Sequence, residues 1–204
     1  MLQLVNVGHK SLADYASLAA RGLMEEIRRL AEPLAGKRVA HVSATAFGGG
    51  VAEINYTLVP LMQSAGLEVE WRIIRGQEDF FNVTKTIHNA LQGNPQGLTD
   101  DDRAVFDHYQ RLNASEFDAG DYDFVVMHDP QPVGMIDHRN GSSGRWIWST
   151  IPPTRPATVG RAFQSASLTV RPNPSRIDFW ITAAAWTWNA FTSTEPTLFR
   201  FERM

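Results

Sequence analysis

The sequence contains no cysteine and little lysine, and both absences narrow the range of functions. Without cysteine, the 204-residue chain can form no disulfide, thiolate metal site or cysteine nucleophile. Nothing requires an oxidising compartment, so the expected location is the cytoplasm. Lysine occurs only at Lys10, Lys37 and Lys85, and the formal net charge is −3. Because no stretch concentrates basic residues, the sequence predicts no nucleic-acid binding.

Long apolar runs are also absent. No window reaches the roughly 18 apolar residues that a membrane span needs, and the first ten residues lack the apolar stretch of a signal peptide. We therefore expect no membrane partner. With 43% hydrophobic residues, the chain is typical of a globular protein whose length suits one catalytic half.

The spacing of apolar residues alternates between helical and strand periods up to Trp148. The helical spacings fall near residues 11–30, 51–62, 80–91 and 99–112, and the strand-like runs near 38–42, 67–74, 124–127 and 146–148. Strands that alternate with helices indicate an α/β fold with a Rossmann-like parallel sheet flanked by helices.

The composition changes after Trp148. Residues 149–204 are rich in Ser, Thr, Pro and Arg and keep no sustained helical or strand period. We therefore predict a domain at 1–148 and an irregular, poorly ordered tail at 149–204.

A glycine cluster lies between the first central strand and the next helix, at Gly48, Gly49 and Gly50. Free backbone N–H groups at such a helix terminus suit a phosphate, and glycine lets a ligand approach the backbone closely. The cluster matches neither the spaced G-x-G-x-x-G fingerprint nor a P-loop. A tight turn without a ligand explains the pattern as well.

His128 and Asp129 follow the strand near 124–127. Polar residues at the carboxyl end of a parallel strand face the crevice where open α/β sheets bind ligands. His128 could bond a sugar hydroxyl, and Asp129 could orient it. The alternative is a strand-ending Asp-Pro turn with a satisfied histidine.

The aromatic residues Trp146 and Trp148 and the six histidines are weaker candidates. A tryptophan face can stack on a sugar ring, but alternate aromatics on a strand are more often core. The histidine spacing supports no metal site.

Together these segments resemble the N-terminal domain of trehalose synthases of the glycosyltransferring and phosphorylase type, in glycosyltransferase family 4. The resemblance covers the leading helix and continues to Trp148, where it is expected to stop. The matching segments are Ala40–Glu53, Leu58–Leu61, Glu70–Ile74, Phe80–Lys85, His88–Gly93, Val126–Pro132 and Trp146–Trp148.

The resemblance implies the first half of a GT-B fold, in which two Rossmann-like domains face a cleft. Its members transfer glucose from a nucleotide sugar to glucose with retention, or cleave trehalose with phosphate. The implied catalytic residues are His128 and Asp129. No tightly bound cofactor is expected, although Mg²⁺ could accompany the donor. The implied substrate-binding residues are Gly48, Gly49, Gly50, Val51 and Trp146.

The chain also departs from the family pattern. Ser149–Pro153 stand where the family has an Arg-Cys-His-Ile-Asp-like run, which indicates a divergent or frameshifted tail. The expected partners are a sugar, a nucleotide sugar and either a second copy or a separate C-terminal domain, without which we expect little turnover. A non-catalytic sugar- or nucleotide-binding half-domain is the alternative. A nicotinamide-dependent oxidoreductase would need the missing glycine fingerprint.

Overall fold

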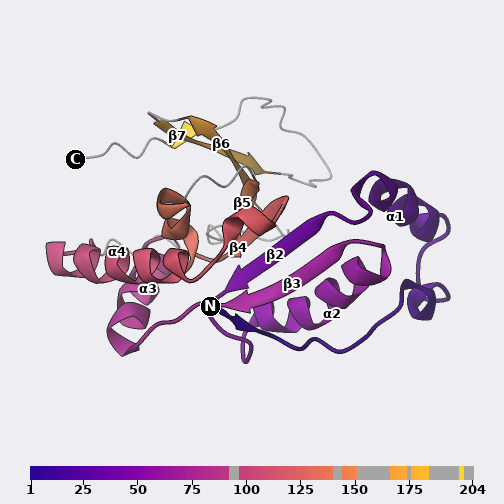
Figure 1. Ribbon diagram of the computed structural model, residues 1–204, viewed down its shortest axis with the longest axis horizontal. Helices are drawn as coiled ribbons and strands as arrows, with labels where there is room; N and C mark the ends of the chain where they lie inside the picture. The colour runs from indigo at the N-terminus through magenta and orange to yellow at the C-terminus, as the bar shows by residue number, and fades with distance from the viewer. Residues whose placement is uncertain (92–96, 140–143, 151–165, 174–175, 184–197, 200–204) are drawn as a thin grey trace, which may run out of the picture.

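The computed structural model describes residues 1–91, 97–139, 144–150, 166–173, 176–183 and 198–199. These residues form one β-sheet with the strand order β1-β3-β2-β4-β5-β6-β7-β8 (Figure 1). The strands are β1 (Gln3–Leu4), β2 (Arg38–Ser43), β3 (Glu68–Ile73), β4 (Phe124–His128), β5 (Arg145–Thr150), β6 (Ala166–Asn173), β7 (Arg176–Ala183) and β8 (Leu198–Phe199).

The centre of the sheet is parallel. Strands β3, β2, β4 and β5 run in the same direction, and β1 pairs with β3 in the opposite direction. From β2 the chain crosses to β3 on one side and then returns to β4 on the other. The strand order therefore reverses between β2 and β4, the place where open α/β sheets form ligand crevices. The predicted α/β fold with a Rossmann-like sheet is confirmed.

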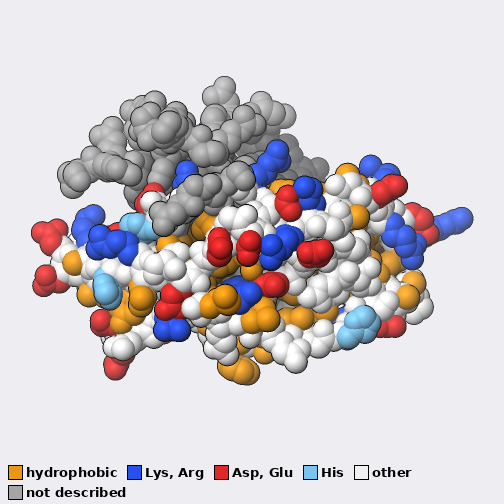
Figure 2. Space-filling model, viewed as in Figure 1, with side chains coloured by type: hydrophobic (Ala, Val, Ile, Leu, Met, Phe, Trp, Pro, Cys, Tyr) orange, Lys and Arg blue, Asp and Glu red, His pale blue; other side chains and the backbone are white. Residues whose placement is uncertain are grey.

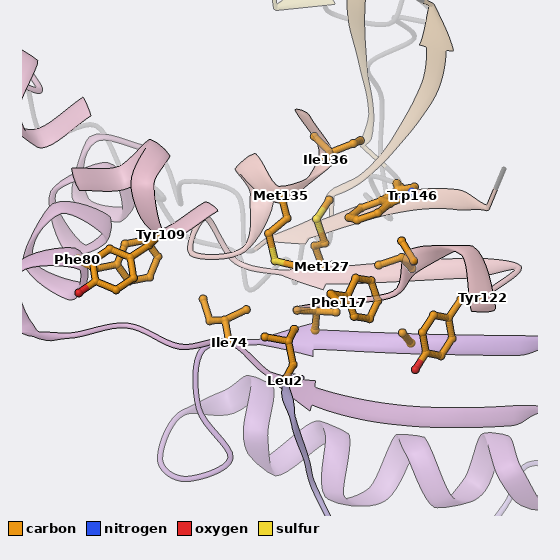
Figure 3. Close-up of a cluster of buried hydrophobic side chains, with 14 residues drawn as sticks. Leu2, Ile74, Phe80, Tyr109, Phe117, Tyr122, Met127, Met135, Ile136 and Trp146 are labelled. Carbon is orange, nitrogen blue, oxygen red and sulfur yellow. The ribbon is translucent and has the colours of Figure 1, made fainter. Parts of the chain in front are cut away.

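Helices cover both faces of the sheet and enclose two apolar cores. On one face, α2 (Gly50–Ser64) and the end of α1 (Leu23–Ala31) pack against β2 and β3. On the other face, α3 (Glu78–Leu91) and α4 (Asp100–Ser115) cover Ala40, Val42 and Met127. Figure 3 shows this second core, in which Phe80 and Tyr109 lie together and Phe117 lies near Trp146.

The predicted leading helix is broken into two pieces. Ser11 does cap a helix, together with Asp14, but this is a short 3₁₀ helix, η1 (Leu12–Tyr15). Helix α1 begins only at Leu23, after Gly22 with a φ of 84°. The prediction of a single leading helix was wrong, because the left-handed backbone at Gly22 cannot belong to a continuous right-handed helix. Helical spacing continued across the break and concealed it.

Other helix boundaries follow the sequence. Thr99 caps α4 by accepting from the Asp102 N–H, while Asp102 accepts from the Thr99 N–H at 2.9 Å. Gly66, after α2, has a φ of 99°, as expected for a left-handed cap. Both predicted boundaries are confirmed.

The tail extends the sheet in the ranges that the structure describes. Strand β6 pairs antiparallel with β5, β7 with β6, and β8 with β7. The prediction of an irregular tail did not anticipate these strands, although the residues of β6 alternate between apolar and polar from Ala166 to Arg171. Residues 151–165, 174–175, 184–197 and 200–204 lie outside the described residues. The boundary at residue 148 and the origin of the tail stay predictions.

The surface mixes charges of both signs. Figure 2 shows acidic and basic side chains interspersed over the face in view, rather than gathered by sign. Among the described ranges, no helix combines the length and the apolar character needed to cross a lipid bilayer.

Candidate functional site at the carboxyl edge of the sheet

Two of the predicted segments leave the sheet side by side. Strands β2 and β4 are parallel neighbours in which Val42 lies opposite Met127. The next residues, Ser43 and His128, end these strands at the same edge. The glycine loop therefore starts beside His128, at the reversal of strand order. We call the edge of the sheet at which β2 and β4 end the carboxyl edge.

The glycine loop has a backbone that other residues rarely adopt. Gly48 has a φ of 67°, and Gly49 has a φ of 89° with a ψ of 158°. A Cβ added at Gly48, Gly49 or Gly50 would meet no atom within 4 Å. Gly48 and Gly49 therefore supply the backbone conformation, and all three glycines leave an open surface rather than relieve a clash.

The start of α2 is available to a ligand. Among the described residues, no side chain caps the first turn of this 15-residue helix, whose first residues are Gly50 and Val51. Uncapped N–H groups and the helix dipole favour an anion there. Thr45 braces the loop, because its Oγ1 accepts from the Phe47 N–H and donates to the Phe47 carbonyl, both at 3.0 Å. The Phe47 side chain is 79% exposed.

His128 is held by a second histidine that sequence analysis did not single out. His41 Nδ1 lies 2.9 Å from His128 Nε2, and the ring centroids are 5.1 Å apart. His41 is 3% exposed, whereas His128 is half-buried. A polar residue within the buried run of β2 was the available signal.

Both imidazoles are neutral near pH 7. Burial, aided by the charge of His128, lowers the pKa of His41 to about 3. Burial also lowers the pKa of His128 to about 4. The carboxyl edge therefore offers hydrogen-bonding imidazole groups without added positive charge.

Asp129 joins β4 to β5 through its backbone. Its φ is 63°, an uncommon value for a residue with a side chain. The Asp129 N–H donates to the Ser149 carbonyl at 2.8 Å. The Asp129 carbonyl accepts from Trp148 Nε1, also at 2.8 Å. These bonds fix the turn that follows His128, while a catalytic role of Asp129 stays a prediction.

Trp146 is not brought to this edge. It lies near the amino end of β5, opposite Val125, and is 3% exposed. Its ring packs edge-on against Phe117 at 6.1 Å, within the core of Figure 3. Its position corrects the expectation of a sugar contact, because side chains two residues apart on this strand lie at different distances from the edge. Trp148, near the carboxyl end, is the tryptophan that reaches the turn at Asp129.

The described residues contain no group of three acidic or imidazole side chains placed to hold a metal ion.

A sequence model described as the N-terminal domain of trehalose synthase matches residues 41–162. The chain belongs to this family. The match continues past Trp148, where the resemblance was expected to stop, into residues outside the described ranges.

Curated relatives of the chain agree with this family. The trehalose synthase of Rubrobacter xylanophilus is 54% identical over 153 residues, covering 72% of this chain and 36% of the relative. The trehalose synthase of Pyrococcus horikoshii is 43% identical over 142 residues, covering 69% of this chain and 34% of the relative. A trehalose phosphorylase of Grifola frondosa is 27% identical over 135 residues, covering 60% and 18%. The chain spans about a third of the length of the trehalose synthases it matches.

Proposed function

We propose that this chain is the acceptor-side N-terminal domain of a retaining glucosyltransferase that makes trehalose from a nucleotide-glucose donor or phosphorolyses it. The observation that carries the proposal is the departure of the glycine loop and His128 from adjacent strands, at the reversal of strand order. The family of the chain supplies the substrate class.

The two segments suit different parts of a glucosyl transfer. The N–H groups near Gly49, Gly50 and Val51 can stabilise the charge that develops on a leaving phosphate. His128 can bond a hydroxyl of the transferred sugar without changing the charge of the site. The opposite wall of the cleft and the nucleotide pocket would come from a C-terminal domain. Any Mg²⁺ would arrive with the donor diphosphate.

An assay of trehalose formation tests this proposal. The chain would be incubated with glucose and either UDP-glucose or ADP-glucose, and separately with trehalose and phosphate. Each reaction would be run with and without the C-terminal portion of the Rubrobacter xylanophilus relative. We expect little turnover by the chain alone and measurable turnover when the portion is added. Absence of turnover in every mixture, with no binding of any substrate, would contradict the proposal.

A non-catalytic half-domain that binds a sugar or a nucleotide is the second candidate, favoured by the uncapped start of α2, which can bind a phosphate without any catalytic group. Calorimetry with glucose, trehalose, UDP-glucose and ADP-glucose distinguishes the two candidates. A binding module gives saturable heat but no product even when the C-terminal portion is present. A glucosyltransferase half gives product in that mixture.

The remaining assignments follow from the same proposal. We propose a sugar and a nucleotide sugar as the small-molecule partners, and a cytoplasmic location. The macromolecular partner would be a C-terminal domain or a second copy of the chain. Sedimentation of the purified chain, alone and with the C-terminal portion, separates these two partners.

A further inference from the structure

The contact between His41 and His128 is the feature of the carboxyl edge that the proposed function leaves unexplained. The side chains of Val39, His41 and Ser43 alternate with Ala40 and Val42 along β2, so they face α2. His41 is almost completely buried on that face, one strand away from His128. The His41 ring is therefore inaccessible to a ligand, but it contacts His128, the histidine implied to bind the sugar.

The atoms in contact decide which side of His128 faces outward. His41 Nδ1 lies 2.9 Å from His128 Nε2, so Nε2 is occupied by a protein partner. The ring nitrogen left for a ligand is Nδ1. Because His128 is only half-buried, a ligand at the carboxyl edge can reach it.

The number of protons in the pair is also restricted. Burial holds the pKa of both rings far below 7, so each ring carries one proton at neutral pH. A hydrogen bond between two neutral imidazoles needs an N–H on one ring and a lone pair on the other. Either His41 donates from Nδ1, or His128 donates from Nε2.

A third atom distinguishes these two arrangements. His41 Nε2 is buried and has no hydrogen-bond partner in the described part of the chain. If His128 donated, His41 would carry its proton at Nε2, where a buried N–H would be unsatisfied. Buried N–H groups without an acceptor are rarer than incompletely satisfied acceptors. The geometry therefore favours donation from His41 Nδ1.

We propose that His41 is a positioning residue that donates from Nδ1 to His128 Nε2 and thereby makes His128 present its Nδ1–H to an oxygen of the substrate. The ligand part of this inference rests on the proposed function. The placement of the proton does not, because it concerns the free protein.

Long-range ¹H–¹⁵N spectra of the histidine-labelled chain test the proton placement, since they distinguish protonated from unprotonated ring nitrogens. We expect His128 to carry its proton on Nδ1 from pH 6 to 8. In His41→Phe, which removes the donor, His128 should show averaged signals of two tautomers. His41→Asn, whose amide can still donate near the Nδ1 position, should restore one tautomer. The ring of His138, which contacts Asp107 at 3.1 Å, is the internal control and should not change.

Two outcomes would overturn the proposal. One is a wild-type His128 with its proton on Nε2 or with averaged signals. The other is a folded His41→Phe variant whose His128 signals match the wild type. If His41→Phe does not fold, the wild-type spectrum and His41→Asn still decide.

The activity readout is separate from the spectra. In the mixture with the added C-terminal portion, His41→Phe should lower kcat roughly tenfold, as loss of an orienting partner does in metal sites, and His41→Asn should recover part of it. An unchanged kcat in folded His41→Phe contradicts the positioning role. Absence of turnover in the wild type contradicts the proposed function, whereas the spectra still test the proton placement.

Discussion

The two edges of the parallel sheet are built in different ways. The amino edge is the edge of the sheet at which β2, β3 and β4 begin, and charged side chains form exposed ion pairs there. Lys37 Nζ is 2.8 Å from Asp123 Oδ1. The Arg38 guanidinium is 3.5 Å from the Asp121 carboxylate and 3.9 Å from that of Glu68. At the carboxyl edge the two histidine rings are neutral and more buried, and Asp129 has a positive φ without being a glycine. Glycines with a positive φ lie at both edges: Gly48 and Gly49 at the carboxyl edge, and Gly36 and Gly66 at the amino edge.

The difference supports the proposal that the carboxyl edge carries the function. Exposed ion pairs cost little to form and contribute little stability, so the amino edge is consistent with a solvated end of the sheet. The positive φ of Asp129 and the two buried imidazoles cost free energy that neither core requires. Asn55, on the buried face of α2, adds an amide with both polar atoms unpartnered in the described structure. Such costs concentrate at sites selected for binding or catalysis.

The largest expected difference between the edges is the pH dependence of stability. The pKa values of His41 and His128, about 3 and about 4, lie below the value of about 6.5 in an unfolded chain. As the pH falls below 6.5, the unfolded state binds protons that the folded state does not. The contribution of the two histidines to the free energy of unfolding is therefore complete above pH 6.5. It should fall by about 2 kcal/mol per histidine by pH 5.

Urea unfolding between pH 7.5 and pH 5 measures this loss. The carboxyl groups of Glu70, Asp102 and Asp123, whose pKa values are lowered, add their own loss only at more acidic pH. His41→Phe should remove about half of the dependence. A stability that stays constant over this range would show that the two rings are not held neutral by the fold.

The next largest effect concerns the glycine loop. Gly49→Ala should destabilise the chain by about 1–3 kcal/mol, because its φ and ψ fall in a region that residues with a Cβ avoid. Gly50→Ala is the matched control. Gly50 lies in the first turn of α2, and its added Cβ would meet no atom, so this change should be neutral or stabilise by up to about 1 kcal/mol.

Urea midpoints of the two glycine variants test the backbone argument directly. Equal midpoints for Gly49→Ala and Gly50→Ala would mean that the loop tolerates a Cβ at both positions. The left-handed conformation at Gly49 would then not be a constraint of the folded chain.

The smallest effect belongs to the amino edge. Lys37→Met removes the exposed contact with Asp123, while the Arg38 N–H still donates to Asp123 at 2.9 Å. The change should cost less than about 1 kcal/mol, and less still in high salt. A cost above that of Gly49→Ala, measured in the same unfolding assay, would reverse the contrast between the two edges.

Sequence patterns predicted the layers of this fold better than its interruptions. Buried strands and amphipathic helices have repeating signals, so the parallel sheet and the cap at Thr99 could be predicted. Gly22 breaks the leading helix without interrupting the helical spacing. The strands β6 and β7 do largely alternate apolar and polar residues, but only over eight residues each, in a tail without a sustained period. Their existence depends on contacts distant in sequence.

The candidate site was predictable in part for the same reason. Glycines after one strand and a histidine after another predicted two neighbouring segments, which the adjacency of β2 and β4 confirms. The pairing of His41 with His128 depends on which strands are neighbours, and no local pattern contains that information. The burial of Trp146 depends on Phe117, 29 positions earlier.

The central claim is that the glycine loop and His128 form one ligand site. Titration with UDP-glucose or ADP-glucose of the ¹⁵N-labelled chain, to which the unlabelled C-terminal portion has been added, tests it most directly. The amide signals of Gly48, Gly49 and Gly50 and the ring signals of His128 are followed together. The account predicts that both sets shift with one Kd, while the amide of Lys37 at the amino edge does not move. Shifts confined to one of the two segments, or two different Kd values, would contradict it.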